Sequence, residues 1–475
     1  MKKYGNRKLF LLVTLAVLSL TGQAQLLRTS YFMEGAQYRL QLNPALVPTR
    51  GYVHLPGVGN TGASFYSNAF GLQDVIDILS NEEDADYFAS DSFMGRLKDD
   101  NHAMASVGSD IIAAGWWHDE KSFMSVNLGV KVNGNFKAPR ALFSFMREMR
   151  GMTTNDYSNY IRSIGNEEVN LTAYTEIGFG YTRLVNDRLT IGGRIKGLLG
   201  LANMHLTVHD ATVKTNLQGL SPDYNWTFGD PTELLEAEGT ASIDVNADLE
   251  TSVEGLELLT NGKSYIDEIK FKAKNMGVSG YGAAVDFGIS YKATQQLTLS
   301  ASIADLGFLC WSKGCTQVAH SNTQDLQFNS ESLGDLARFA DVISSSSPVN
   351  TDILRLTIDE QGVKSRTTRL ASTISVGADY ALQGDKVSLG ALYTHHGDDI
   401  QAQDEVTLSV NLHPSSLVDV SVSYSPLLCG GKSAGVALRV GPVFLGTDYI
   451  YTGRNTRSCN ALAGVSIPLG KKPNQ

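Results

Sequence analysis

From about residue 100 to its end, the chain repeats a two-residue alternation of apolar and polar positions. In the segment that begins at Tyr281 the odd positions are apolar, and the even positions between them are small or polar, including Asp286. Such a segment forms a strand with one apolar and one polar face. The alternation recurs at 124–132, 171–182, 189–196, 374–380, 387–393, 406–412, 418–424, 436–440, 443–451 and 461–469. The pattern predicts an all-β protein.

The length of these segments favours a membrane barrel. Most run for nine residues or more, and a tilted strand needs about 9 to 11 residues to cross a bilayer. A soluble β-sandwich or β-solenoid is the alternative, but sandwich strands are usually about 5 to 6 residues long. Aromatic residues such as Tyr281 and Tyr291 lie near the segment ends, as in an interfacial girdle. We therefore predict a transmembrane antiparallel β-barrel.

Loop lengths orient the barrel and set the strand number. The tight joints at 382–385, 413–416 and 441–442 alternate with longer ones at 397–403, 429–433 and 453–458. Short turns belong on the periplasmic side, which makes 312–366 a long extracellular loop and 352–359 a hairpin within it. We expect about 14 spanning strands if 188–216 is one long strand that projects beyond the membrane, and about 16 if it is two, within a range of about 12 to 16. Helical spacing predicts a few short helices at 71–79, 138–150 and 332–343.

The first 24 residues read as a signal peptide. Basic residues precede an apolar stretch at 9–20 that is too short to span a membrane, and the small residues Gly22 and Ala24 follow it. A retained anchor is the alternative. Removal of four basic and no acidic residues would change the net charge from -10 to -14, which argues against nucleic acid as a partner. The segment 25–50 lacks the alternation, and the barrel is expected over 51–475.

Two short motifs carry a resemblance to a known family. Asn43-Pro44-Ala45 lies near the expected mature amino end, and Asp305-Leu306-Gly307-Phe308 ends a strand. In these features the chain resembles the FadL-like outer-membrane transporters, most closely the uncharacterised FadL-like barrels of Bacteroidota. The resemblance implies a 14-strand barrel whose segment 25–50 folds inside as a plug that contains Asn43, Pro44 and Ala45. The chain departs from the family in two ways, because it ends at Gln475 rather than at an aromatic residue and the family's ligand pocket cannot be matched residue by residue.

Charged residues fall on the polar faces of the predicted strands. Parity points these side chains into the lumen: Lys131, Glu176, Arg194, Lys196, Asp286, Asp379, Asp419, Arg439 and Asp448. One interpretation is that opposite charges pair there and hold the strands and the plug in register. The other is contact with a substrate. We favour the first.

Motifs for catalysis, metal or cofactor binding are weak. The sequence contains no HExxH and no GxSxG, and the GxGxxG match at 57–62 continues as extended chain instead of opening a helix. His395 and His396 with Asp398 and Asp399 form a loop cluster that could hold a metal or a hydrolase site, although a solvated loop is the simpler interpretation. We expect no enzyme, no cofactor and no metal.

Four cysteines in an exported chain can form disulfides. Cys310 and Cys315 bracket a short turn, and Cys429 and Cys459 emerge on the same side of the barrel two strands apart. The spacing predicts the pairs Cys310 with Cys315 and Cys429 with Cys459. It does not suit zinc, because no CxxC occurs.

These expectations lead to one function and two alternatives. The resemblance implies a passive transporter of small hydrophobic compounds in the outer membrane of a Gram-negative bacterium, with outer-membrane lipids and a small hydrophobic ligand as partners. The first alternative is a secretion-associated or scaffolding barrel, which would present the 312–366 loop to a secretion-machinery or surface protein. The second is a rim hydrolase built around His396 and Asp398.

Overall fold

The computed structural model describes most of the chain. The described residues are 27–56, 59–71, 73–74, 90–151, 158–218, 238–262, 264–266, 268–321, 324–328, 354–382, 386–397, 400, 402–415, 417–427, 432–450 and 456–471. The predicted signal peptide, the predicted helix at 332–343 and most of the predicted helix at 71–79 lie outside these residues.

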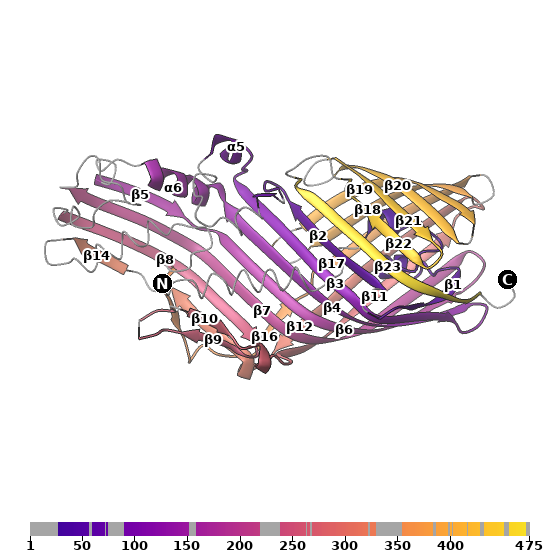
Figure 1. Cartoon of the computed structure of the whole chain (residues 1–475), viewed down its shortest axis with the longest axis horizontal. Helices are drawn as coiled ribbons and strands as arrows, with labels where there is room; N and C mark the ends of the chain where they lie inside the picture. Colours follow the sequence, from indigo (N-terminus) through magenta and orange to yellow (C-terminus); the bar gives the residue numbers. More distant parts are fainter. Residues whose placement is uncertain are drawn as a thin grey trace.

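Fourteen antiparallel strands close into a barrel, as the sequence predicted (Figure 1). Its first wall strand consists of two pieces, β1 (Arg50–His54) and β2 (Asn60–Ser67), which both pair with the next strand and with the last one. The others follow in the order β3 (Asp100–Trp117), β4 (Ser122–Pro139), β6 (Glu167–Leu184), β7 (Leu189–Gln218), β11 (Gly280–Lys292), β12 (Leu297–Trp311), β17 (Ser372–Leu382), β18 (Val387–Gly397), β19 (Ala402–Ser415), β20 (Val418–Leu427), β21 (Ser433–Val440), β22 (Val443–Thr447) and β23 (Ser458–Lys471).

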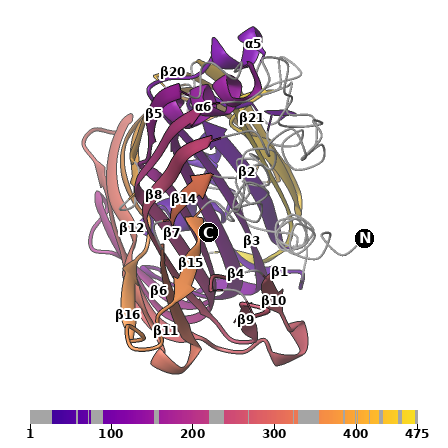
Figure 2. The ribbon, with the colours of Figure 1, turned by 90° about the vertical axis from the view of Figure 1, so that its left-hand side faces the viewer.

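One side of the barrel is taller than the other. β7 is a single strand of 30 residues, whose first part pairs with β11 and whose second part pairs with β8 (Glu238–Val253) beyond the barrel. Of the two alternatives for 188–216, the structure thus shows the single projecting strand, and with it the expected count of about 14. β5 (Ser158–Ile164), β13 (Thr316–Ser321), β14 (Gln324–Phe328) and β15 (Leu356–Ile358) widen the projecting sheet (Figure 2).

The remaining short elements lie along the loops and at the amino end. They are η1 (Arg28–Ser30), α2 (Arg39–Leu42), α5 (Asp91–Met94), α6 (Arg140–Gly151), β9 (Leu256–Leu259), β10 (Glu268–Phe271), η4 (Ala273–Asn275), η5 (Lys313–Cys315) and β16 (Arg366–Arg369). α6 confirms the helix predicted at 138–150. Within the predicted loop 312–366, β15 pairs with β13 of the same loop and is not a spanning strand, as expected, although β14 lies between the two in the chain.

The barrel is apolar outside and polar inside. On β11 the side chains of Phe287 and Ile289 are exposed, whereas Asp286, directly before Phe287, is completely buried. The same arrangement, with apolar side chains exposed and polar ones buried, occurs on β19, where Leu408 and Val410 are exposed and Ser409 is buried. A strand wall of this kind suits lipid on one side and a polar interior on the other. Separately, the described helices include none that is both long and apolar enough to cross a bilayer.

The wall is irregular where β1 and β2 meet. The ladder with β23 is interrupted between the pair that His54 forms with Ser466 and the pair that Thr61 forms with Ala463. The Tyr38 hydroxyl donates to the Gly59 carbonyl at this break (2.9 Å). A side chain from the amino-terminal segment thus satisfies backbone that the ladder leaves free, as a wall in lipid requires.

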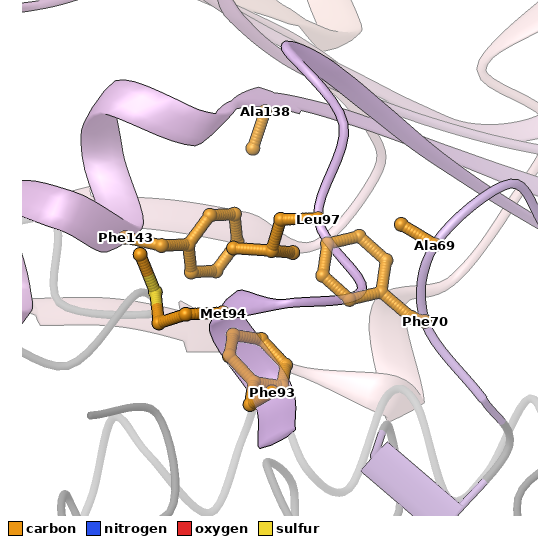
Figure 3. Close-up of a cluster of buried hydrophobic side chains, with 7 residues drawn as sticks. All are labelled: Ala69, Phe70, Phe93, Met94, Leu97, Ala138 and Phe143. Carbon is orange, nitrogen blue, oxygen red and sulfur yellow. The ribbon is translucent and has the colours of Figure 1, made fainter. Parts of the chain in front are cut away.

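A compact aromatic cluster joins the outer ends of the first strands to α5 and α6. Phe70, Phe93 and Phe143 are buried, with ring centroids 5.5 to 6.1 Å apart (Figure 3). Met94, Leu97, Ala69 and Ala138 complete it. Ring pairs at these distances add to the apolar burial, so the cluster fixes both helices over this end of the barrel.

The predicted disulfide between Cys310 and Cys315 is absent, because both are free thiols. Cys310 is exposed near the end of β12, where its sulfur lies 3.4 Å from Thr367 Oγ1. Cys315 is partly buried, and this burial raises the pKa of its thiol. Cys310 lies on β12, whereas Cys315 ends η5 after that strand has ended, so the short sequence spacing does not bring the two thiols together. Cys459 is also free, and Cys429 lies outside the described residues.

Candidate functional site: the barrel lumen and the segment that fills it

Residues 27–47 pack against inward-facing side chains of the barrel wall. Thr29, Ser30, Tyr31, Met33 and Asn43 have no exposed side-chain area. The backbone-to-backbone hydrogen bonds of residues 27–46 join residues within the segment itself, in turns, η1 and α2. The segment therefore adds no strand to the barrel, and side chains attach it to the wall.

The predicted plug residues Asn43, Pro44 and Ala45 lie against β6, β7, β11 and β12. Asn43 Oδ1 accepts from the Ala45 backbone N–H (2.9 Å), which is the side-chain turn that asparagine favours. Its Nδ2 donates to the Ala301 carbonyl (3.2 Å) and to the Tyr31 hydroxyl (3.1 Å). The Thr182 hydroxyl donates to the Pro44 carbonyl (2.6 Å). These bonds connect the motif to strands that come from distant parts of the chain.

Glycines in the wall form the seat for this motif. Gly192 on β7 and Gly288 on β11 are cross-strand partners. A Cβ atom on Gly192 would overlap the Pro44 carbonyl, and one on Gly288 would overlap Asn43 Oδ1. Glycine is the residue that permits so close an approach of backbone and neighbouring chain. Part of the high glycine content, 46 of 475 residues, is thereby explained by contact with this segment.

A second anchor holds the start of the segment. The Arg28 guanidinium forms an ion pair with Glu405 of β19, lies 3.6 Å from Asp448 Oδ2 and donates to the Tyr449 hydroxyl (2.6 Å). The Thr29 backbone N–H donates to Asp448 Oδ1 (2.8 Å). All these charged side chains are at least nine-tenths buried. Charge-assisted bonds of this kind are the stronger class of hydrogen bond.

Six charged side chains meet on the wall formed by β4, β6, β7, β11 and β12. Lys196 Nζ lies 2.7 Å from Asp286 Oδ1 and 2.6 Å from Asp305 Oδ1. Arg194 contacts Asp286 and Glu176, each at 3.3 Å, and Lys131 contacts Glu176 at 2.9 Å. Three cations and three anions balance, so the cluster has no net charge. This arrangement favours the interpretation that opposite charges pair with one another inside the barrel over the interpretation that they contact a substrate.

The other predicted lumen residues lie elsewhere. Asp419 and Arg439 pair at 2.5 Å on β20 and β21, with His413 Nδ1 2.8 Å from Asp419 Oδ1. Asp448 belongs to the Arg28 anchor, and Asp379 is half-buried near the end of β17. The nine predicted residues thus fall into three groups and one separate residue.

Four charged residues of the lumen were not predicted there from the sequence, although Asp305 belongs to one of the two motifs that carry the family resemblance. Asp305 lies beside a register shift between β11 and β12 and has a positive φ of 59°, so simple parity does not place it. Asp110 accepts from Asn60 (2.9 Å) and from Gln41 of the inner segment (2.8 Å). Arg28 lies in a region without alternation. Glu405, in contrast, precedes the alternating run at 406–412, and the parity rule would have found it.

The predicted rim cluster does not converge among the described residues. His395 points outward, with Nδ1 2.9 Å from Asp404 Oδ1, whereas His396 lines the lumen and its Nδ1 lies 2.8 Å from Thr373 Oγ1. Adjacent residues on a strand face opposite sides. Asp398 and Asp399 lie outside the described residues. In the described part of the chain, no three His, Cys, Asp or Glu side chains are arranged to hold a metal ion.

Above the inner segment, towards the end with the long loops, lies a cavity of about 80 Å³, which we call the vestibule. Arg28 and Leu42 of the segment contribute to its lining. Its walls carry Ser106, Val107, Lys131, Asn133, Tyr174, Asp305, Ala371, Thr373, Thr394, His396, Gln403 and Glu405. Most of these residues are polar or charged, but more of the surface that faces the cavity is apolar than polar, so the vestibule has a mixed lining.

Residues 44–448 match the model of a family described as a family of unknown function (DUF5723). No curated protein matches the chain. Among solved structures, the Ralstonia pickettii toluene transporter TbuX is similar, with 9% identity over 95% of this chain and 100% of that one, and a TM-score of 0.42. A Pseudomonas aeruginosa FadL homologue shares 9% identity over 94% of this chain and 97% of its own, with a TM-score of 0.32.

Proposed function

Because the chain belongs to this family of unknown function, we propose a function from its geometry: a passive transporter in the outer membrane of a Gram-negative bacterium, closed by residues 27–47. The closed barrel, apolar outside and polar inside, supports a membrane location. The lumen filling supports a closed state in which the amino-terminal segment acts as a plug.

The observation that carries the proposal is the way the segment is attached. Bonds that involve side chains, such as those of Arg28 and Asn43, attach it to the wall, while its backbone-to-backbone hydrogen bonds stay within the segment. Such a plug can move without breaking any wall ladder, which a gate requires. A segment built into the wall as a strand would have to unzip first.

A scaffolding barrel is the second candidate, and the filled lumen favours it. The vestibule measures only about 80 Å³. Below it, the inner segment fills the lumen and the six-charge cluster lies on the wall. A scaffold would need no release of the plug. The two candidates therefore differ in whether weakening the plug opens a path for solutes.

Single-channel recording in planar bilayers tests the proposal. Arg28→Met removes the charge that pairs with Glu405 and Asp448. We expect channels of this variant to open frequently, whereas channels of the unchanged protein open rarely. Arg188→Met is the matched control, because Arg188 is exposed in the turn before β7. A folded Arg28→Met barrel with the conductance of the control, and no flux of small solutes into liposomes, would favour the scaffold.

A further inference from the structure

We propose that protonation of His54 releases residues 27–47 from the wall, so that acid opens the barrel. This inference rests on the proposed function and names what controls the plug. Its basis is a buried histidine without a hydrogen-bond partner, next to the carboxylate that binds the plug.

His54 ends β1 at the break in the wall and is 3% exposed. Its ring packs against two tyrosine rings, with centroids 5.6 Å from Tyr38 of the inner segment and 5.1 Å from Tyr52 of β1. Neither of its ring nitrogens has a hydrogen-bond partner. The neutral ring is therefore held by packing alone, and a proton on it would have no direct partner in the closed barrel.

Asp110 of β3, the one acid within 4 Å of this ring among the described residues, also holds the inner segment. It is 1% exposed, and its Oδ2 accepts from Gln41 Nε2 (2.8 Å) and from Asn60 Nδ2 (2.9 Å). His54 Nδ1 lies 3.9 Å from the same oxygen, which is too far for a hydrogen bond. The other oxygen, Oδ1, lies against Gly129 of β4. The carboxylate is thus engaged by the plug and the wall, and not by the histidine.

A second contact between the inner segment and the wall adjoins the same ring. The Tyr38 hydroxyl donates to the Gly59 carbonyl (2.9 Å). Gly59 itself packs on His54, because a Cβ atom on Gly59 would overlap His54 Cβ. A movement of the His54 ring would therefore disturb the Tyr38 contact as well as the Gln41 contact.

The other groups around His54 supply no charge that could balance a proton. They are the uncharged side chains of Tyr38, Tyr52, Asn60 and Ser466, the cross-strand partner of His54 on β23. Asp110 is attracted by Arg194 and Lys131 of the six-charge cluster and repelled by Glu176. The two cations compete with any charge that arises on His54.

A proton on His54 would place an unpaired charge in a buried site, which is costly. To pair with Asp110, the ring would have to approach an oxygen whose two lone pairs already accept hydrogen bonds, at the expense of the bond from Gln41. To meet water instead, the ring would have to leave Tyr38. Both routes weaken the attachment of the inner segment, whereas the neutral ring leaves both contacts intact.

Linkage between proton binding and release of the plug gives the sign and the size of the effect. In the released state His54 meets water and ionises near the ordinary histidine pKa of about 6.5. The state that binds the proton more readily gains as pH falls, so the closed state is favoured above about pH 6.5 and is lost progressively below it. For a histidine that takes up the proton only on release, the shift reaches about tenfold at pH 5.5.

Single-channel recording of the full barrel at pH 7.5 and pH 5.5 tests this inference. We expect the open probability of the unchanged protein to rise at least about threefold at the lower pH. His54→Phe keeps a ring against Tyr38 and Tyr52 but cannot bind a proton. Because neither nitrogen of His54 has a partner, this variant should fold and lose the response. His118→Phe, in the exposed turn between β3 and β4, should keep it.

Hydrogen exchange of residues 27–46, corrected for its intrinsic pH dependence, gives a second measurement that does not depend on conduction. The segment should lose protection at pH 5.5 in the unchanged protein and in His118→Phe, but not in His54→Phe. Equal acid responses of the His54 and His118 variants would overturn the inference, as would unchanged protection of the segment at pH 5.5.

If His54→Phe fails to fold, as shown by loss of heat-modifiable gel migration, His54→Gln replaces it and the same loss of response is expected. Conductance of Arg28→Met is measured on the same preparations. Openings of Arg28→Met without any acid response would reject only the control by His54. Acid-induced loss of protection without openings in any variant would reject only transport.

Discussion

Replacement of Asp286 by asparagine should strongly destabilise the barrel. Asp286 is completely buried and contacts Lys196 Nζ at 2.7 Å and Arg194 Nη1 at 3.3 Å. Asparagine retains the oxygen that accepts from the Asp305 backbone N–H (2.7 Å), so the substitution mainly removes the charge. The six-charge cluster would then carry one unpaired positive charge in a buried place.

The magnitude follows from the two distances. At an effective dielectric constant of about 20, charges 2.7 Å and 3.3 Å apart attract by about 6 and 5 kcal/mol. Dehydration of the charges and repulsion between the three anions offset part of this attraction. Breaking a buried ion pair typically costs about 3 to 5 kcal/mol, and we expect a loss in that range. A lumen position in contact with water would lose far less.

Urea unfolding of the barrel in detergent, followed by heat-modifiable gel migration, measures this loss. Lys196→Met alone should also destabilise, whereas the double variant restores a balance of two cations and two anions and should recover at least 2 kcal/mol relative to the sum of the single losses. Asp187→Asn, at an exposed turn, should change stability by less than about 0.5 kcal/mol. A loss below about 1 kcal/mol for Asp286→Asn, or strictly additive single losses, would show that the six charges do not act as a neutral unit.

Three further predictions concern the plug and the projecting sheet. Deletion of 39–49 should raise single-channel conductance while the barrel still assembles, because side chains alone attach this segment; normal assembly with unchanged conductance would contradict the plug. Gly192→Ala should loosen the plug and raise conductance, whereas Gly197→Ala on the same strand should not, because no atom lies within 4 Å of its Cβ position; equal conductance of the two variants would reject the glycine seat. In the projecting sheet, hydrogen bonding to Asp248 raises the pKa of His320. This contact therefore stabilises fully below the ordinary histidine pKa of about 6.5 and is lost as pH rises through the raised value. Hydrogen exchange at 316–321, corrected for its intrinsic pH dependence, should show more protection at pH 5.5 than at pH 8, and His320→Asn should abolish the difference.

Periodicity alone was sufficient for the barrel. Each strand must expose apolar side chains to lipid and direct polar side chains into the interior. Its sequence therefore alternates between apolar and polar residues with a period of two. For the same reason the sequence placed Asp286 and Lys196 on the polar face, whereas it left open whether 188–216 forms one strand or two. The tight turns, which alternate with longer joints, then led to the strand count.

The tertiary structure decided which residues meet. Asp305 pairs with Lys131 and Lys196 from strands more than a hundred residues away in the chain, and a register shift removes it from simple parity. Gly192 and Gly288 gain their role only when Asn43 and Pro44 dock against them. Residues 27–47 have no repeating pattern, because their side chains contact different places on the wall. The two-residue period of a strand follows from the lipid on one side of it and the lumen on the other, and needs no other part of the chain. The ion pairs, the glycine seat and the vestibule instead depend on contacts between distant parts of the chain.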